Sequence, residues 1–297
     1  MARHFLTGLE LSEGELAALL ERAAELKRDR PRAGATALVG RSVALVFEKP
    51  STRTRVSFEV GVSELGGTPI VLRGDELQLS RGESIADTGR VLSRYVAAIA
   101  VRSGSDEAVA ALADAADVPI VNALTPGHHP CQALADLLTL EERFDTLEGL
   151  RLAYVGDGNN VARSLALLGG VAAVDVVVSS PPGYELSDAP EGTELITDPA
   201  EAVAGADAIY TDVWVSMGDE GDAEARRAAL APYRVDADLL AAASEGAIVL
   251  HCLPAHPGEE ITADLLYGPA SAVWDQAENR LHVQKALLEL LVGSGAI

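Results

Sequence analysis

Two kinds of apolar pattern alternate along this chain. Short apolar runs bounded by polar or glycine turns are typical of buried parallel strands, and they occur at 42–47, 68–72, 97–101 and 119–122. Between them, apolar residues recur at helical spacing over 52–65, 84–94 and 106–116. An earlier helix is predicted after Ser12, which forms a capping-box pattern with Glu15. The first part of the chain is therefore predicted to be a β-α-β-α domain.

A second series of the same kind follows a predicted helix at 130–144. Its predicted strands lie at 152–155, 173–179, 194–197, 208–211 and 247–251, with helices at 160–168, 199–204, 223–231 and 236–243. A last helical pattern covers 277–292. A chain of 297 residues exceeds what one compact core usually serves. We therefore expect two doubly wound α/β domains with parallel sheets and the active site in the cleft between them. The first domain is predicted to comprise 1–132 joined by the final helix 277–297, and the second 133–276.

Composition narrows the class of protein and its partners. Apolar residues make up 48% of the chain and aromatic ones only 4%, which favours layered helix and sheet packing. The net charge of −22 excludes nucleic acid and anionic membrane as partners, because the summed field repels both. Acidic residues are in large excess, and the basic residues are nearly all arginine. Both features favour adaptation to a high-salt cytoplasm. No apolar run is long enough to span a bilayer, and two cysteines make no disulfide framework.

The segment Ser51-Thr52-Arg53-Thr54-Arg55 follows the predicted strand 42–47 and opens a helix. A strand-to-helix turn presents unpaired backbone N–H groups and the positive end of the helix dipole. Hydroxyl donors and guanidinium groups add charge-assisted hydrogen bonds there. A helix cap needs only one hydroxyl, so the pattern predicts a cradle for a phosphate group.

This segment, followed by Ser57-Phe58-Glu59, resembles the carbamoyl phosphate signature of the aspartate and ornithine carbamoyltransferases. Arg102 at a strand end and the His129-Pro130-Cys131-Gln132 motif match further positions of that family in order. The resemblance spans nearly the whole chain and implies that carbamoyl phosphate is bound. The implied ligands are Ser51, Thr52, Arg53, Thr54, Gln78, Arg102, His129, Gln132, Cys252, Leu253 and Arg280.

The second half of the chain resembles the ornithine branch of the family, through the sequence D-V-W-V-S-M-G at 212–218 and H-C-L-P at 251–254. The resemblance implies carbamoyl transfer to the δ-amine of L-ornithine, giving citrulline and phosphate, without a metal or an organic cofactor. A carboxylate and a thiol also suit a cationic amine better than an anionic acceptor. The implied ornithine ligands are Asn160, Asp212, Ser216 and Met217. The implied catalytic residues are Arg53, Arg102, His129, Asp212 and Cys252. In the family, the loop that holds Gln78 reaches a neighbouring subunit, which implies a homotrimer.

Other functions stay open at this point. Gly156 and Gly158 begin a dinucleotide-binding pattern, but Val161 stands where the third glycine belongs. A non-catalytic anion-binding protein would explain the cradle but not Asp212 and Cys252. A carbamoyltransferase for putrescine or an acylated ornithine is the nearest enzymatic alternative. A zinc site is the remaining one, although its candidate ligands are too closely spaced for the usual pairs. Those candidates are His128, His129, Cys131, His251, Cys252 and His256.

Overall fold

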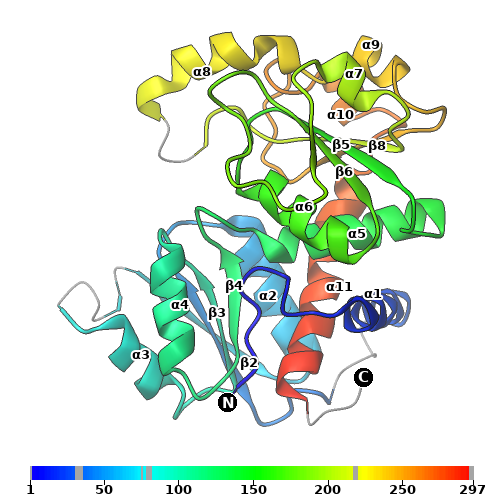
Figure 1. Cartoon of the computed structure of the whole chain (residues 1–297). Coiled ribbons are helices and arrows are strands. Elements are labelled where there is room, and N and C mark those ends of the chain that lie inside the picture. The colour runs from blue at the N-terminus through cyan, green and yellow to red at the C-terminus, as the bar shows by residue number, and fades with distance from the viewer. Residues whose placement is uncertain (1, 31–35, 75, 78–81, 217–219, 294–297) are drawn as a thin grey trace. The chain divides into compact units, whose positions relative to one another are not determined.

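The computed structural model describes residues 2–30, 36–74, 76–77, 82–216 and 220–293. The chain divides into two compact units, Met1–Leu138 with Glu278–Ile297 and Thr139–Ala277. The predicted boundary at 132 lies near the start of helix α5 (Pro130–Phe144), whereas the units divide within this helix. Each unit has its own parallel sheet, as the sequence predicts, and we describe the two units separately (Figure 1).

The sheet of the first unit has the strand order β2-β1-β3-β4, with all neighbours parallel. Its strands are β1 (Ser42–Phe47), β2 (Thr68–Arg73), β3 (Ala98–Arg102) and β4 (Ile120–Leu124). The connecting helices are α2 (Thr52–Glu64), α3 (Ile85–Leu92) and α4 (Asp106–Ala115), and α1 (Glu13–Arg28) precedes the sheet. All of these elements lie within a few residues of their predicted positions.

Strand β2 differs from its prediction in burial. We expected every strand to be buried, but side chains of β2 alternate between exposed and half-buried, from Thr68 to Arg73. Among the described residues, β2 is an edge strand that pairs with β1 alone, whereas the other edge strand, β4, is covered by the N-terminal segment at Phe5. By contrast, β1 lies between two neighbours and buries five successive residues from Val43 to Phe47.

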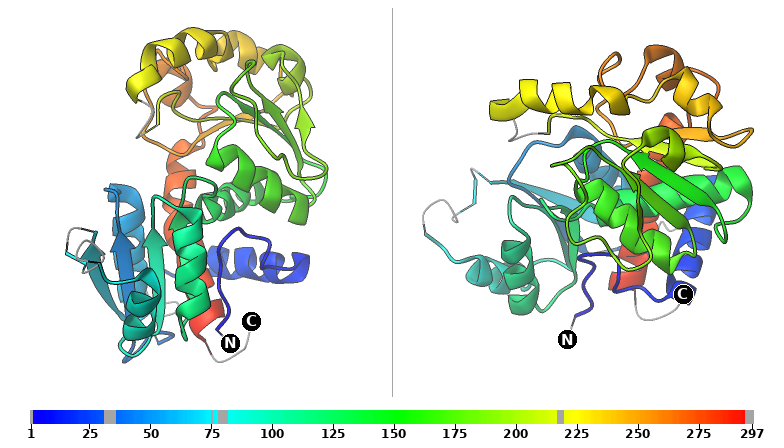
Figure 2. Two further views of the ribbon diagram at one scale, coloured as in Figure 1. Left: turned by 60° about the vertical axis from the view of Figure 1, so that its left-hand side comes forward. Right: turned by 45° about the horizontal axis from the view of Figure 1, so that its top comes forward.

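Both ends of the chain pack within the first unit. The N-terminal segment runs beside β4 (Figure 2), where the backbone N–H of Phe5 donates to the carbonyl of Ile120 at 2.8 Å. The closing helix α11 (Val273–Val292) enters this unit at Glu278. Arg22 of α1 pairs with Glu289 of α11 at 2.7 Å. On the α2 side, a Cβ added to Gly61 would lie only 3.2 Å from the side chain of Lys285, so glycine permits this close approach.

The sheet of the second unit has the order β7-β6-β5-β8-β9, again with parallel neighbours. Its strands are β5 (Arg151–Val155), β6 (Asp175–Ser179), β7 (Glu194–Leu195), β8 (Ala208–Thr211) and β9 (Ile248–His251). Its helices are α6 (Asn160–Val171), α7 (Pro199–Val203), α8 (Ala223–Leu230), α9 (Ala237–Ala241) and α10 (Ala263–Leu266), with 3-10 turns at Glu220–Asp222 and Ala231–Tyr233.

Three details of this unit depart from the predictions. Strand β6 begins at Asp175 rather than at 173, because Ala173 has a left-handed backbone (φ 55°) that no strand accepts. The helix α10 was not predicted; it has only four residues and too few turns to show a periodic pattern. Helix α11 begins at Val273, earlier than 277.

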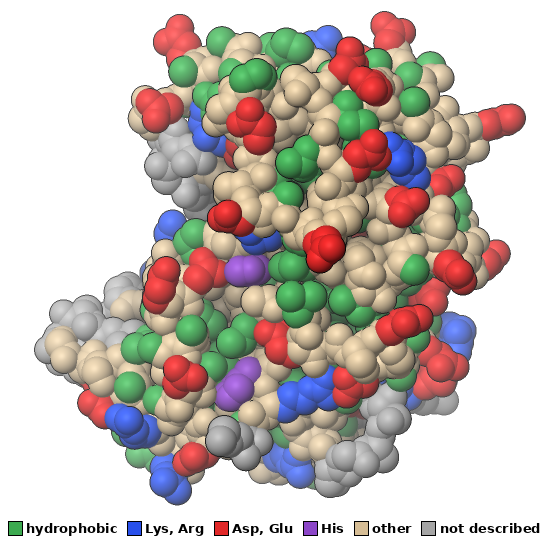
Figure 3. Space-filling model, in the orientation of Figure 1, with side chains coloured by type: hydrophobic (Ala, Val, Ile, Leu, Met, Phe, Trp, Pro, Cys, Tyr) green, Lys and Arg blue, Asp and Glu red, His purple; other side chains and the backbone are tan. Residues whose placement is uncertain are grey.

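The surface reflects the composition. Asp and Glu side chains are spread over the visible face, and Lys and Arg are fewer (Figure 3). None of the helices in the described ranges is both long and apolar enough to cross a membrane.

Candidate functional site

The predicted site residues follow the strands at which the order of strand addition reverses in each sheet. In the first unit the chain runs outward from β1 to β2 on one side and from β3 to β4 on the other. In the second unit it runs from β5 towards β7 on one side and from β8 to β9 on the other. Parallel sheets bind ligands beyond the carboxyl ends of the strands at such a switch point. The cradle follows β1 and Arg102 ends β3, whereas Asn160 follows β5 and Asp212 follows β8.

The cradle lies at the first turn of α2. Ser51 precedes the helix in an extended conformation (φ −157°, ψ 106°), yet its hydroxyl makes no capping hydrogen bond. Within the described part of the chain, the exposed Arg53 guanidinium makes no hydrogen bond or ion pair, whereas Arg55 is bound to Glu59 at 3.0 Å. The hydroxyl of Ser51 and the guanidinium of Arg53 are therefore available to an anion. Arg55 is instead held along the surface of its own helix.

Thr54 belongs to a buried chain of polar side chains. Arg280 of α11 donates to the Thr54 hydroxyl at 2.7 Å and to the Gln132 amide oxygen at 3.0 Å. Gln132 in turn donates to the carboxylate of Asp136 at 2.8 Å, and all four side chains are buried. Since the Thr54 oxygen accepts from Arg280, its own proton remains available for a ligand. Asp136 is a functional candidate that the sequence analysis missed. Its signal was an acid four residues after Gln132 on an otherwise apolar helix face.

Glu48 connects the two loops that carry the predicted phosphate ligands. Phe47 and Arg102 are paired at the ends of β1 and β3, so the following loops begin side by side. One carboxylate oxygen of Glu48 accepts from the Ser103 hydroxyl and from the Gly104 backbone, both at 2.8 Å. The register between β3 and β4 also shifts at Arg102. Such an irregularity re-aims a side chain at the end of a strand.

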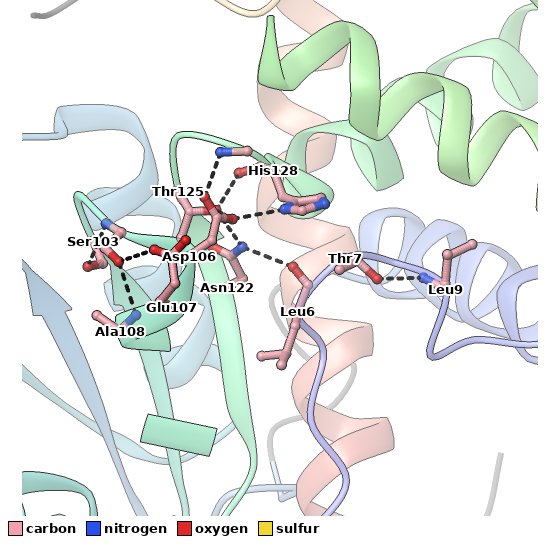
Figure 4. A network of polar contacts seen from close by, with 12 residues as sticks. Leu6, Thr7, Leu9, Ser103, Asp106, Glu107, Ala108, Asn122, Thr125 and His128 are labelled. Atoms are coloured by element: carbon pink, nitrogen blue, oxygen red, sulfur yellow. Dashed lines mark hydrogen bonds and ion pairs between the residues drawn. The ribbon is translucent and has the colours of Figure 1, made fainter. Parts of the chain in front are cut away.

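A polar network around Asp106 orders the loop just before His129 (Figure 4). The Asp106 carboxylate accepts from the Thr125 hydroxyl at 2.5 Å and from the Gly127 backbone at 2.8 Å, and contacts His128 Nδ1 at 2.9 Å. Burial raises the pKa of Asp106, but its hydrogen bonds outweigh this effect and leave the pKa below the usual value. Asp106 therefore fixes the loop that leads directly into His129.

The electrostatics of His129 favour a neutral ring. Its side chain is buried, and this burial, together with the positive charges of Arg280 and Arg102, holds its pKa well below the usual value. A neutral imidazole can donate one hydrogen bond to a carbonyl oxygen without adding charge. The neighbouring Cys131 behaves differently, because burial raises the pKa of its thiol to about 12 and leaves it an inert core residue.

In the second unit, Asp212 and Cys252 follow the neighbouring strands β8 and β9, whose ends pair through Thr211 and His251. The Cys252 thiol donates to Asp212 Oδ1 at 2.8 Å. The same oxygen accepts from the Val213 backbone at 2.8 Å, and Oδ2 accepts from the side-chain amide of Asn159 at 2.8 Å. Asp212 is thus a buried carboxylate with a defined orientation.

His251 orders the segment that contains Cys252. Its Nδ1 accepts from the backbone N–H of Leu253 at 2.9 Å, so the proton lies on Nε2, which faces Glu260 Oε1 at 3.2 Å. Leu253 has a left-handed backbone (φ 59°), a conformation that costs a non-glycine residue roughly 1 kcal/mol or more. The fully buried His251–Glu260 pair holds this strained turn.

Donor atoms of Asp212, His251 and Cys252 lie within 4.8 Å of one another, a spacing compatible with a metal ion. The sequence analysis did not group Asp212 with the two others. In this arrangement, however, both ring nitrogens of His251 already have partners. The ring would have to give up its bond to Leu253 or to Glu260 to bind a metal.

The glycine pattern after β5 has a packing explanation. A Cβ on Gly158 would lie 2.2 Å from the backbone nitrogen of Leu186, so the chain itself makes the close approach at this glycine. Asp157 forms an ion pair with Arg226. These contacts explain the pattern without a dinucleotide.

The predicted residues that the structure describes are divided between the two units. The first unit contains Ser51, Thr52, Arg53, Thr54, Arg102, His129, Gln132 and Arg280, and the second contains Asn160, Asp212, Ser216, Cys252 and Leu253. Gln78 and Met217 lie outside the described residues. The supporting residues Glu48, Asp106, Asp136, Asn159 and Glu260 were not predicted from the sequence. Glu48, Asp106 and Asn159 act through partners distant in the sequence, whereas Asp136 and Glu260 lie only four and nine positions from Gln132 and His251.

Comparisons with known proteins also match the chain in two parts, but the second match includes residues 278–291, which lie in the first unit of the structure. Residues 3–142 match the carbamoyl-P binding domain of aspartate/ornithine carbamoyltransferase, and residues 148–291 match its Asp/Orn binding domain. The chain is 57% identical to an ornithine carbamoyltransferase of Acidothermus cellulolyticus, covering 98% of this chain and 97% of that protein. It is 50% identical to an ornithine carbamoyltransferase of Methanoculleus marisnigri, covering 99% of this chain and 98% of that protein. The solved ornithine carbamoyltransferase from Pyrococcus furiosus matches with a TM-score of 0.92 at 46% identity, covering 99% of this chain and 98% of that one.

Proposed function

The chain belongs to the aspartate/ornithine carbamoyltransferase family, and on this basis we propose that it transfers the carbamoyl group of carbamoyl phosphate to the δ-amine of L-ornithine. The products are citrulline and phosphate. The observations that carry this proposal are made in each unit separately. One offers uncommitted anion donors, and the other offers a buried carboxylate beside a thiol.

In the proposed reaction, the first unit binds carbamoyl phosphate. Ser51, Thr52, Arg53, Thr54 and Arg102 hold the phosphate, with Gln132, Arg280, Gln78, Cys252 and Leu253 completing the ligand set. The guanidinium groups stabilise the charge that develops as phosphate departs. Thr54, Arg102 and the neutral His129 polarise the carbonyl, which makes its carbon more electrophilic. The C–N bond forms as the C–O bond to phosphate breaks, and a proton is released.

The second unit binds ornithine in this proposal, through Asn160, Asp212, Ser216 and Met217. The amine must be neutral to attack, and the Asp212 carboxylate orients its N–H bonds. Cys252 donates to that carboxylate at 2.8 Å, and a neighbouring negative charge disfavours the thiolate. This supports a role for Cys252 in positioning the carboxylate and the amine rather than in removing the proton.

We further propose a homotrimer in the cytoplasm of a cell with high internal salt. Large apolar side chains of the first unit are exposed in the single chain, the kind of surface that a subunit interface covers. They include Val56 on α2, Ile70 on β2, Val91 on α3 and Tyr95 just after it. The net charge of −22 supports the adaptation to salt.

The test is a citrulline assay with carbamoyl phosphate and three acceptors in parallel: ornithine, putrescine and acetylornithine. We expect a clear preference for ornithine in kcat/KM. A preference for either other amine would assign the chain to a different acceptor. Absence of product with all three amines would refute carbamoyl transfer to this class of acceptor.

A further inference from the structure

Asn159, which the proposed ligand set does not include, makes two kinds of contact near the proposed ornithine ligands. It is the N-cap of α6, where its Oδ1 accepts from the backbone N–H groups of Val161 at 2.9 Å and Ala162 at 3.2 Å. Tyr154 also donates its hydroxyl to Oδ1 at 3.2 Å. Because three donors face Oδ1, the orientation of the amide is fixed, and Nδ2 must point the other way. There it donates to Asp212 Oδ2 at 2.8 Å.

The bonds of Asp212 show where an amine can bind. A carboxylate has about four acceptor positions, two on each oxygen. Among the described residues, Oδ1 accepts from Val213 and Cys252, whereas Oδ2 accepts only from Asn159. The open acceptor position is therefore on Oδ2, the oxygen that the Asn159 amide holds. Of the three hydrogen bonds that orient this carboxylate, the one from Asn159 lies on the oxygen that an amine would approach.

Asn159 also sets the position of Asn160, the first residue of α6, because capping fixes where that helix begins. We propose that Asn159 is a positioning residue for the acceptor amine: it orients Asp212 Oδ2 and, through the α6 cap, the adjacent Asn160. This inference rests on the proposed function, since the amine in question is that of ornithine.

The two roles of Asn159 can be separated by substitution. Serine and aspartate both cap helices well, so Asn159→Ser and Asn159→Asp keep the cap and remove the amide donor. Aspartate also places a second negative charge beside Asp212. The matched control is Asp198→Ser, which changes the N-cap of α7 in the same unit without touching Asp212.

The experiment measures KM for each substrate, kcat and the melting temperature of the full-length enzyme and its variants. Loss of this hydrogen bond to the charged Asp212 should raise the ornithine KM by about tenfold to a hundredfold, because hydrogen bonds to charged groups are stronger than those between neutral groups. The KM of carbamoyl phosphate and the melting temperature should stay near the wild-type values, and Asp198→Ser should change neither KM. Asn159→Gln should not keep the wild-type ornithine KM, because its longer side chain displaces the amide.

Two outcomes overturn the inference: an unchanged ornithine KM in Asn159→Ser, or an equal loss for both substrates. If Asn159→Asp fails to fold, Asn159→Ser and Asn159→Gly decide the question, since glycine also caps with little cost. Failure of the proposed function is recognised separately, because the wild-type enzyme would then form no citrulline from ornithine.

Discussion

Substitution of Asp106 by alanine tests whether the loop before His129 is held by one carboxylate. Asp106 accepts hydrogen bonds from Thr125 and the Gly127 backbone and contacts His128, over 2.5–2.9 Å (Figure 4). A net contribution of about 1 kcal/mol per bond gives about 3 kcal/mol for the three. We take about 2 kcal/mol, because the Asp106 side chain is 34% exposed and solvent screens its charge.

For a domain of this size, about 2 kcal/mol corresponds to a fall in melting temperature of about 4–8 °C. A displaced His129 should also lower kcat by about tenfold to a hundredfold, since small misplacements of a catalytic group are costly. The measurements are a thermal melt and steady-state citrulline formation. Asp87→Ala is the matched control, because among the described residues this exposed carboxylate bonds to Ser84 and Arg90, both close to it in sequence.

The result that would refute this reasoning is an Asp106→Ala enzyme with the wild-type melting temperature and kcat. A loss of stability with normal kcat would show that the loop is stabilised but that His129 does not depend on it.

Three further predictions concern charge. Arg53→Ala should lower kcat/KM by about a hundredfold or more, because it removes a proposed phosphate donor. Arg55→Ala breaks a surface ion pair with Glu59 and should change kcat/KM little. Equal effects of the two substitutions would contradict the different roles of these arginines. The hydrogen bond from Arg3, with those from Ser12, lowers the pKa of Glu15 to about 2 from 4.5. Its stabilisation should be complete above the unfolded value near 4.5 and disappear as pH falls towards 2, so wild type and Glu15→Gln should converge in melting temperature in acid. Because its net charge is −22, the enzyme should have a lower melting temperature in dilute buffer than in molar salt, which screens the repulsion between its acidic side chains. An unchanged melting temperature with full activity in dilute buffer would exclude adaptation to salt.

Local patterns were sufficient for most of the fold. Apolar runs such as 42–47 and 208–211 predicted the central strands, because a strand buried on both faces must be apolar throughout. They did not distinguish the edge strand β2 from its neighbours, since burial depends on which strands pair with it. Ala173 likewise looks like a strand residue in the sequence but adopts a left-handed turn.

The sequence by itself predicted the family, which the comparisons confirm, and the candidate residues of each unit, because candidate phosphate donors and a candidate acceptor carboxylate lie in short motifs after predicted strands. Only the tertiary structure decided which side chains support them. Arg280 reaches Thr54 across 226 positions, and Asn159 reaches Asp212 across 53. Hydrogen bonds act only over about 3 Å, so their partners are selected by the fold and leave no periodic signal along the chain. The cradle and Asp212 could therefore be named as candidates from the sequence, whereas the contact between Asn159 and Asp212 could not.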